Sequence, residues 1–321
     1  MTVTLEIPVI DLAGSDGAER EKLCKEVVRA CEQWGFFQVI NHGVDESLKR
    51  RALDVYTDFF YLSPEEKMKV VIPEGSLDGW MHPDLEAPGA FLKNFLGPYT
   101  PEFLNNTWLP DLPQHRQRLP TNPSSFQSTI LEFQKAARGL HENLLQMMAE
   151  GLGLESDAFL KHLPNPGMKT RSNFYPLVPA DTYVGPNQAH SDASATTLLC
   201  DTVSGLEVMS DNAWVQVQSR SDGFIVNVGD QLEILSNGRF KSILHRGSRN
   251  TSKERLAVAC FYLPNSDSVM APIEELVVCD QLPKYRAIRF GDYFKSFIDK
   301  GNECKGRIEG LKITNRGLCL R

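Results

Sequence analysis

Three residues with metal-binding side chains, His190, Asp192 and His245, offer the clearest chemistry in this 321-residue sequence. His190 and Asp192 belong to a His-Ser-Asp sequence, and alternate residues of an extended strand point to the same face. An imidazole nitrogen and a carboxylate oxygen can therefore reach one point. His245 comes later, at the end of a predicted strand, and completes a set of two histidines and one carboxylate. Such a set on one face of an octahedron leaves three open positions, which is the arrangement of non-haem Fe(II) sites.

Other interpretations of this triad remain open from the residues alone. His190 and Asp192 can occupy a surface turn, and His245 can be a core histidine bonded to a backbone carbonyl. The triad can also bind zinc in a hydrolase, which would need a positioned general base and would leave Arg255 unexplained. Finally, the triad can be a structural remnant in a jelly-roll protein that binds ligands without catalysis.

A second chemical signal is Arg255, which begins an apolar run that ends at Tyr262. A charge buried without a partner in such a strand costs several kcal/mol, so the guanidinium needs a counter-ion. A bound dicarboxylate is one candidate, because guanidinium pairs with carboxylate through two parallel hydrogen bonds. The alternative is a strand face that leaves Arg255 in solvent.

Two regions of the chain supply the elements that must position these residues. The first alternates short strands with amphipathic helices, and we predict strands over 7–12 and 34–42 and helices over 18–33, from Ser63, over 125–151 and over 155–162. Residues 74–123 are rich in proline and glycine and are interpreted as loops. In the second region, short strands separated by turns are predicted over 171–175, 196–201, 206–209, 214–218, 223–228, 241–245 and 255–262. Asn237-Gly238 is expected to turn a hairpin that ends at His245, and a last helix is expected over 291–300.

This order of elements predicts a mainly β protein with flanking helices and a double-stranded β-helix, or jelly-roll, core. We expect one domain over residues 1–321. Within it, residues 1–169 form a mostly helical N-terminal region, 170–272 the jelly-roll catalytic core, and 273–321 a C-terminal helix and tail.

Composition excludes several other classes of protein. A net charge of −7 argues against a nucleic-acid binder, which would show a basic face. The sequence has neither a secretory signal nor the run of about 18 apolar residues that a membrane span needs. Seven scattered cysteines without a CxxC pair do not indicate disulfides or structural zinc. We therefore expect a cytoplasmic protein, as a monomer, with a small-molecule substrate and without nucleic-acid or membrane partners.

Longer stretches of the sequence resemble a known family. Six of them carry the resemblance: Ile7-Pro-Val-Ile-Asp11, Trp34-Gly-Phe-Phe-Gln-Val-Ile-Asn-His42-Gly43, Phe59-Phe-Tyr-Leu-Ser63, Asn173-Phe-Tyr175-Pro, Ala189-His-Ser-Asp192, and the run from Gly229 to Gly247. Together they are similar to the plant-type 2-oxoglutarate/Fe(II)-dependent dioxygenases. The similarity is closest to the flavonoid group, which contains anthocyanidin synthase, flavonol synthase and flavone synthase.

The resemblance implies roles for individual residues. The triad described above matches the iron ligands, and Arg255 matches the arginine that binds the distal carboxylate of 2-oxoglutarate. Tyr175 and Asn173 match residues that hydrogen-bond this cosubstrate. Phe261 falls where flavonoid dioxygenases place an aromatic ring against the substrate, although core packing explains it equally well. Arg171 falls where some members carry a basic residue near the substrate.

Two further positions bear on this resemblance. His42 matches a family position, but we interpret Asn41-His-Gly43 as structural. The family usually has Arg-x-Ser, whereas here the third position is Ala257, so a hydroxyl that would bind the distal carboxylate is absent. That absence puts cosubstrate affinity in question, and it keeps open an oxidase of the same fold that works without 2-oxoglutarate.

The activity implied by the resemblance is oxidation by O2 coupled to decarboxylation of 2-oxoglutarate to succinate and CO2, with ascorbate as a supporting reductant. The outcome is hydroxylation or desaturation of a small planar molecule, for which a flavanone is the first candidate. A hormone, another phenolic or an alkaloid is the alternative substrate. The segment Trp80–Pro110 is expected to help close the pocket.

Overall fold

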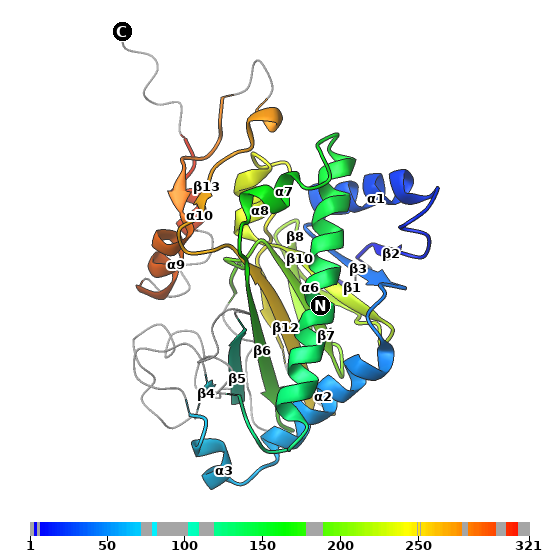
Figure 1. Cartoon of the computed structure of the whole chain (residues 1–321), viewed down its shortest axis with the longest axis vertical. Coiled ribbons are helices and arrows are strands. Elements are labelled where there is room, and N and C mark those ends of the chain that lie inside the picture. Colours follow the sequence, from blue (N-terminus) through cyan, green and yellow to red (C-terminus); the bar gives the residue numbers. More distant parts are fainter. Residues whose placement is uncertain are drawn as a thin grey trace.

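Most strands of the protein belong to one large sheet, and a smaller sheet packs against one of its faces (Figure 1). The computed structural model describes residues 3–4, 7–71, 79–81, 102–108, 119–177, 189–248, 250, 252–277, 282–299 and 306–313. The large sheet has eight strands in the order β2 (Val9–Asp11), β3 (Phe36–Ile40), β10 (Gly223–Val228), β7 (Thr196–Asp201), β12 (Arg255–Leu263), β6 (Gly167–Tyr175), β5 (Glu102–Trp108) and β4 (Gly79–Met81). The small sheet has the order β1 (Val3–Thr4), β9 (Ala213–Val217), β8 (Leu206–Ser210) and β11 (His245–Gly247), and a separate pair joins β13 (Val269–Met270) to β14 (Ile288–Arg289). This pair of facing sheets is the predicted jelly-roll core.

Helices α1, α2 and the long α6 cover the other face of the large sheet, whereas α9 and α10 lie to one side of it (Figure 1). The helices are α1 (Arg20–Gln33), α2 (Glu46–Phe60), α3 (Pro64–Met68), α6 (Phe126–Gly151), α7 (Ala158–His162), α8 (Asp230–Leu235), α9 (Phe290–Asp299) and α10 (Gly306–Glu309), with a 3-10 turn at Glu274–Leu276. Helix α6 contacts both α1 and α2, and its buried residues recur three or four apart, as the sequence pattern predicted. None of the helices in the described ranges has the length and apolar character needed to cross a membrane.

Strand β12 separates two hydrophobic cores. Its even-numbered residues, such as Leu256 and Val258, belong to the core between the large sheet and the helices. Its odd-numbered residues Ala257 and Ala259 belong to the core between the two sheets. Because side chains alternate along a strand, a strand buried on both faces appears as a continuous apolar run in the sequence. Arg255 shares the face of the odd-numbered residues.

Many predicted elements are confirmed. The helices predicted over 18–33, 125–151 and 291–300 are α1, α6 and α9, and the strands predicted over 196–201 and 223–228 are β7 and β10. The helix predicted from Ser63 is α3, where the Ser63 hydroxyl accepts a hydrogen bond from the backbone N–H of Glu66, as an N-cap should.

The hairpin predicted around Asn237-Gly238 is wrong. Strand β10 leads into helix α8 instead, and residues 241–244 are not a strand. Asn237 and Gly238 both have positive φ, 52° and 75°, and they end α8: the Gly238 N–H donates to the Glu233 carbonyl at 2.8 Å. Two consecutive left-handed residues suit a two-residue hairpin and a helix C-terminus equally, which explains the error.

The interpretation of residues 74–123 as loops is wrong for two segments. Strands β4 and β5 lie within that range and extend the large sheet beyond β6. Trp80, in β4, is 1% exposed. Most of the segment expected to close the pocket, Trp80–Pro110, lies outside the described residues. Since β2 to β5 share one sheet with β6, which spans Gly167–Tyr175, and with later strands, the division of the chain near residue 170 remains a prediction.

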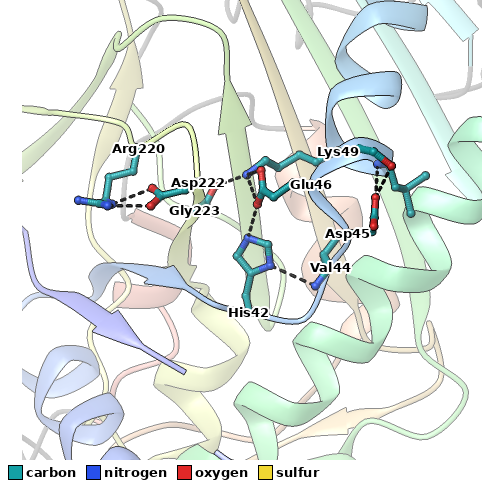
Figure 2. Close-up of polar contacts among 10 residues, drawn as sticks. His42, Val44, Asp45, Glu46, Lys49, Arg220, Asp222 and Gly223 are labelled. Carbon is teal, nitrogen blue, oxygen red and sulfur yellow. Dashed lines mark hydrogen bonds and ion pairs between the residues drawn. The ribbon is translucent and has the colours of Figure 1, made fainter. Parts of the chain in front are cut away.

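Helix α2 was not among the predicted elements, and His42 lies in the turn between β3 and the helix N-cap, Asp45 (Figure 2). The His42 Nδ1 accepts a hydrogen bond from the Val44 N–H at 3.2 Å, and its Nε2 lies 3.5 Å from Glu46. Glu46 pairs with Lys49 at 2.9 Å, and the Lys49 ammonium donates to the Gly223 carbonyl at 3.4 Å. Burial lowers the pKa of His42. These contacts tie β3, α2 and β10 together, which supports a structural role for His42.

Candidate active site

The backbone brings the two histidines of the triad side by side. His190 and His245 form an isolated antiparallel bridge, in which each N–H donates to the other's carbonyl at 3.0 and 2.9 Å. Their ring centroids lie 4.4 Å apart. Asp192 follows two residues after His190, so its carboxylate points to the same place.

The three side chains are placed so that they could hold one metal ion. Their ligand atoms all lie within 4.8 Å of one another. Asp192 Oδ1 lies 3.8 Å from His190 Nε2 and 3.5 Å from His245 Nε2. The other ring nitrogen of His245, Nδ1, lies 3.2 Å from the Ile243 carbonyl, a contact that fixes the tautomer with Nε2 free to bind a metal. Two imidazoles and one carboxylate therefore fit Fe(II) with open positions left for other ligands.

Two polar residues hold the Asp192 carboxylate in place. The Thr197 hydroxyl donates to Asp192 Oδ2 at 2.7 Å, and the Asn227 side-chain amide donates to the same oxygen at 3.2 Å. Burial raises the pKa of Asp192. The two histidines and these hydrogen bonds lower it by more, so the net shift is downward. Asp192 is therefore held as a carboxylate with Oδ1 directed toward the histidines. Thr197 and Asn227 were not predicted as site residues. Thr197 lies two positions from Leu199 on β7 and therefore shares its inward face, a signal that the alternation of the strand contained.

Replacing Thr197 with valine is expected to weaken Fe(II) affinity about 10–100-fold, because valine keeps the shape but removes the hydrogen bond that orients Asp192. Iron retained per chain after dialysis against a graded chelator checks this expectation. The matched control is Thr196→Val, which removes the neighbouring hydroxyl that lies 2.7 Å from His141 on the other face of β7. Equal iron loss in both variants would mean that the effect is only destabilisation of the strand.

The start of helix α8 supports the loop that carries Asp192. The Asp230 N–H donates to the Asp192 carbonyl at 2.8 Å, and Gly229 N–H to that of Ala195 at the same distance. A Cβ on Gly229 would lie 2.0 Å from the Ser194 carbonyl oxygen, so no larger residue fits without movement of the backbone. Helix α8, which occupies the place of the predicted hairpin, thus positions a candidate metal ligand.

Replacing Gly229 with alanine is expected to destabilise the protein by about 1–3 kcal/mol, the usual effect of overpacking. Urea denaturation followed by circular dichroism measures the change. Gly139→Ala is the control, because a Cβ there meets nothing within 4 Å. Gly139 lies inside helix α6, where alanine should raise stability by about 0.5–1 kcal/mol. Similar effects at both positions would contradict the proposed close approach.

A cavity of about 60 Å³ opens beside the triad, between the two sheets. The inward residues of β6, β7 and β12 line it, and they include every residue predicted to bind cosubstrate or substrate: Arg171, Asn173, Tyr175, Arg255 and Phe261. The register explains this gathering, since Tyr175 pairs with Arg255 and Asn173 with Ala257 across β6 and β12. The Asn173 Oδ1 is buried without a hydrogen-bond partner among the described residues, so it is available to a ligand.

Arg255 lies at one end of this cavity, 1% exposed, with its guanidinium 4.8 Å from the Tyr175 ring centroid. Its Nη2 donates to Asp201 Oδ2 at 3.0 Å, and this ion pair was not predicted. Asp201 ends strand β7 and is the register partner of Ala257. The alternative of a solvent-exposed Arg255 is wrong, and its partner in the protein is a carboxylate of the chain itself.

A second cavity of about 50 Å³ also borders His190 and Asp192. Arg171, His190, Asp192 and Phe261 line both cavities. The second cavity adds Lys169, Leu263 and Phe294, of which Phe294 comes from α9. Burial lowers the pKa of Arg171, and the nearby Asp192 opposes this shift.

The jelly-roll fold and the His-Asp-His set together define a non-haem iron oxygenase. Comparison with known proteins agrees. Residues 7–96 match the family described as non-haem dioxygenase in morphine synthesis N-terminal, and residues 166–264 match the 2OG-Fe(II) oxygenase superfamily. The chain therefore belongs to the 2-oxoglutarate/Fe(II)-dependent oxygenases and is an enzyme that uses iron and 2-oxoglutarate. The zinc hydrolase and the non-enzymatic binding protein are thereby excluded.

Individual relatives cover nearly the whole chain. Jasmonate-induced oxygenase 4 of Arabidopsis thaliana is 34% identical over 97% of this chain and 87% of its own length. Flavonol synthase/flavanone 3-hydroxylase of the same plant is 34% identical over 92% of this chain and 87% of its own. Among solved structures, JOX2 in complex with 2OG, Fe and JA has a TM-score of 0.83 and 30% identity, covering 98% of this chain and 91% of that one. The flavonoid group is thus among the similar proteins, together with a jasmonate-induced oxygenase.

Proposed function

We propose that this enzyme holds Fe(II) on His190, Asp192 and His245, and that it oxidises a small organic molecule with a flat or apolar body and an acidic group. When bound, iron and 2-oxoglutarate supply the oxidation by O2, with release of succinate and CO2. The chain itself contributes orientation and a site from which water is excluded. The observation that carries the substrate class is the composition of the second cavity.

Two cations and two aromatic rings line that cavity next to the triad. Lys169 and Arg171 lie on the inward face of β6, and the register places Lys169 opposite Phe261. Lys169 is 7% exposed. A carboxylate or phenolate suits these cations, because a charged hydrogen bond in a buried place is stronger than one in water. Phe261 and Phe294 offer faces for a ring to pack against.

Two substrate candidates follow. A flavanone is the first, because flavanone 3-hydroxylases are among the similar proteins and its phenol groups are weak acids. A jasmonate is the second, and the two cations favour it, because its carboxylate is fully ionised at neutral pH. Whether the product is hydroxylated or desaturated depends on the pose of the substrate to within about an ångström.

The test incubates iron-reconstituted protein with 2-oxoglutarate and O2 and either naringenin or jasmonic acid, and follows succinate and product masses. A product sixteen mass units heavier or two lighter, matched to succinate, identifies the substrate and the outcome. Lys169→Met is expected to raise KM for an acid while leaving KM for its methyl ester unchanged, with Lys161→Met on the exposed end of α7 as control. Turnover of neither compound would exclude both candidates, and an equal effect of Lys169→Met on acid and ester would contradict the acidic substrate.

We further propose that the enzyme works in the cytoplasm as a monomer. The four cysteines that the structure describes, Cys24, Cys31, Cys200 and Cys260, are buried and free, which supports a reducing compartment. Sedimentation of the purified protein tests the oligomeric state.

A further inference from the structure

Arg255 is the cation best placed to bind the distal carboxylate of 2-oxoglutarate. Two arginines line the cavity beside the triad, Arg171 and Arg255. Arg171 is close enough to Asp192 for the two charges to interact, and it also lines the second cavity. Arg255 lies at the Tyr175 end of β6 and makes no contact with the triad among the described residues. A dicarboxylate whose 2-oxo acid end is at the metal would therefore direct its far end to Arg255.

The donors of Arg255 are already partly used by the protein. Asp201 Oδ2 accepts from Nε at 3.3 Å and from Nη2 at 3.0 Å, so it takes one edge of the guanidinium. Nε also lies 3.0 Å from the Val203 carbonyl, and Nη1 lies 3.4 Å from that of Ser248. A guanidinium has five N–H donors. One N–H on each terminal nitrogen is left without a partner among the residues that the structure describes, enough for one carboxylate.

The charge of Arg255 is also offset. The side chain of Asp201 is 0% exposed and that of Arg255 is 2% exposed, so water does not screen this pair. The position opposite Asp201 on β12 is Ala257, which offers no hydroxyl to a ligand. A carboxylate that binds Arg255 would therefore meet an ion pair without net charge, in which the carboxylate of Asp201 repels it.

We propose that Asp201 sets the cosubstrate affinity and specificity of this enzyme. Its carboxylate partly neutralises the positive charge with which Arg255 would attract the distal carboxylate of 2-oxoglutarate. The site then discriminates weakly between 2-oxoglutarate and a 2-oxo acid of the same length with an uncharged tail. Asp201 acts through Arg255 and is a positioning residue. This inference concerns the cosubstrate end of the cavity and is independent of the substrate proposed above.

The test measures binding instead of turnover. Calorimetric titration of the Fe(II) protein without oxygen gives the Kd of 2-oxoglutarate and of 2-oxopentanoate, in which a methyl group replaces the distal carboxylate. Asp201→Asn keeps an oxygen acceptor for Arg255 but removes the charge. We expect it to tighten 2-oxoglutarate binding about tenfold or more, because the repulsion between like charges is removed, and to leave 2-oxopentanoate binding unchanged. The control Asp222→Asn removes an exposed carboxylate that pairs with Arg220, and should change neither Kd.

Two results would overturn the proposal. One is an unchanged or weaker affinity of Asp201→Asn for 2-oxoglutarate, and the other is an equal shift for both oxo acids. Should Asp201→Asn fail to fold, the two Kd values of the wild-type protein test the proposal by themselves. A preference for 2-oxoglutarate over 2-oxopentanoate of about tenfold or less supports the proposal, whereas a larger preference contradicts it, since an unopposed guanidinium would favour the dicarboxylate more strongly.

Discussion

Replacing His190 with alanine is expected to abolish turnover and to lower Fe(II) affinity by more than about 100-fold. Removing a residue that only orients a metal ligand already lowers metal affinity about 10–100-fold, and His190 is itself one of three proposed ligands. The remaining pair, Asp192 and His245, cannot fix an ion in one geometry. Iron per chain after anaerobic reconstitution, together with succinate formation, measures the two effects.

The fold should tolerate this change, which makes the loss of iron interpretable. The His190 side chain is 16% exposed, more than those of Asp192 and His245 at 4% and 8%. His162→Ala, at the exposed end of α7, is the control for loss of a histidine and should leave iron content unchanged. Full iron content and turnover in His190→Ala would show that His190 is not a ligand.

The triad was predictable because it depends on local geometry. The i and i+2 spacing of His190 and Asp192 indicated a common site, although residues 190–192 contain only an isolated bridge at His190 and no strand. His245 was expected at the end of a strand and instead begins β11. The cavity-lining residues of β6 and β12 follow the same i and i+2 spacing. The backbone bridge between His190 and His245, which brings the two parts together, could not be derived from spacing.

The ion pair between Asp201 and Arg255 could not be predicted from the sequence. The position of Asp201 beside Arg255 depends on the register between β7 and β12, and a shift of one residue would turn its side chain to the helical face. Helix α8 was missed for a different reason, because Asn237-Gly238 fits two kinds of chain reversal. The position of Asp201 is decided by pairing between strands far apart in the sequence, whereas the end of α8 is closed by a local hydrogen bond from Gly238 to Glu233.

Replacing Arg255 with methionine is expected to destabilise the protein by about 3–5 kcal/mol, because it leaves the carboxylate of Asp201 buried without its counter-ion. That is a large part of the total stability of a typical domain, about 5–15 kcal/mol. Urea denaturation at neutral pH measures the change. Arg239→Met is the matched control: Arg239 pairs with Glu32 on the surface, where both side chains are about one third exposed or more, and its loss should cost less than about 1 kcal/mol.

The pH dependence of the deficit separates an unpaired charge from lost packing. Burial raises the pKa of Asp201, and the nearby Arg255 opposes this rise. Without Arg255, the folded state holds the Asp201 proton more tightly than the unfolded state does, so its penalty grows as the pH rises above the ordinary range of aspartate. The deficit of Arg255→Met should therefore shrink as the pH is lowered toward 4, and Asp201→Leu in the same chain should recover most of the stability at neutral pH, since both charges are then gone. A deficit that is independent of pH and persists in the double variant would mean that Arg255 stabilises the sheet through its packing on Tyr175, and not through its charge.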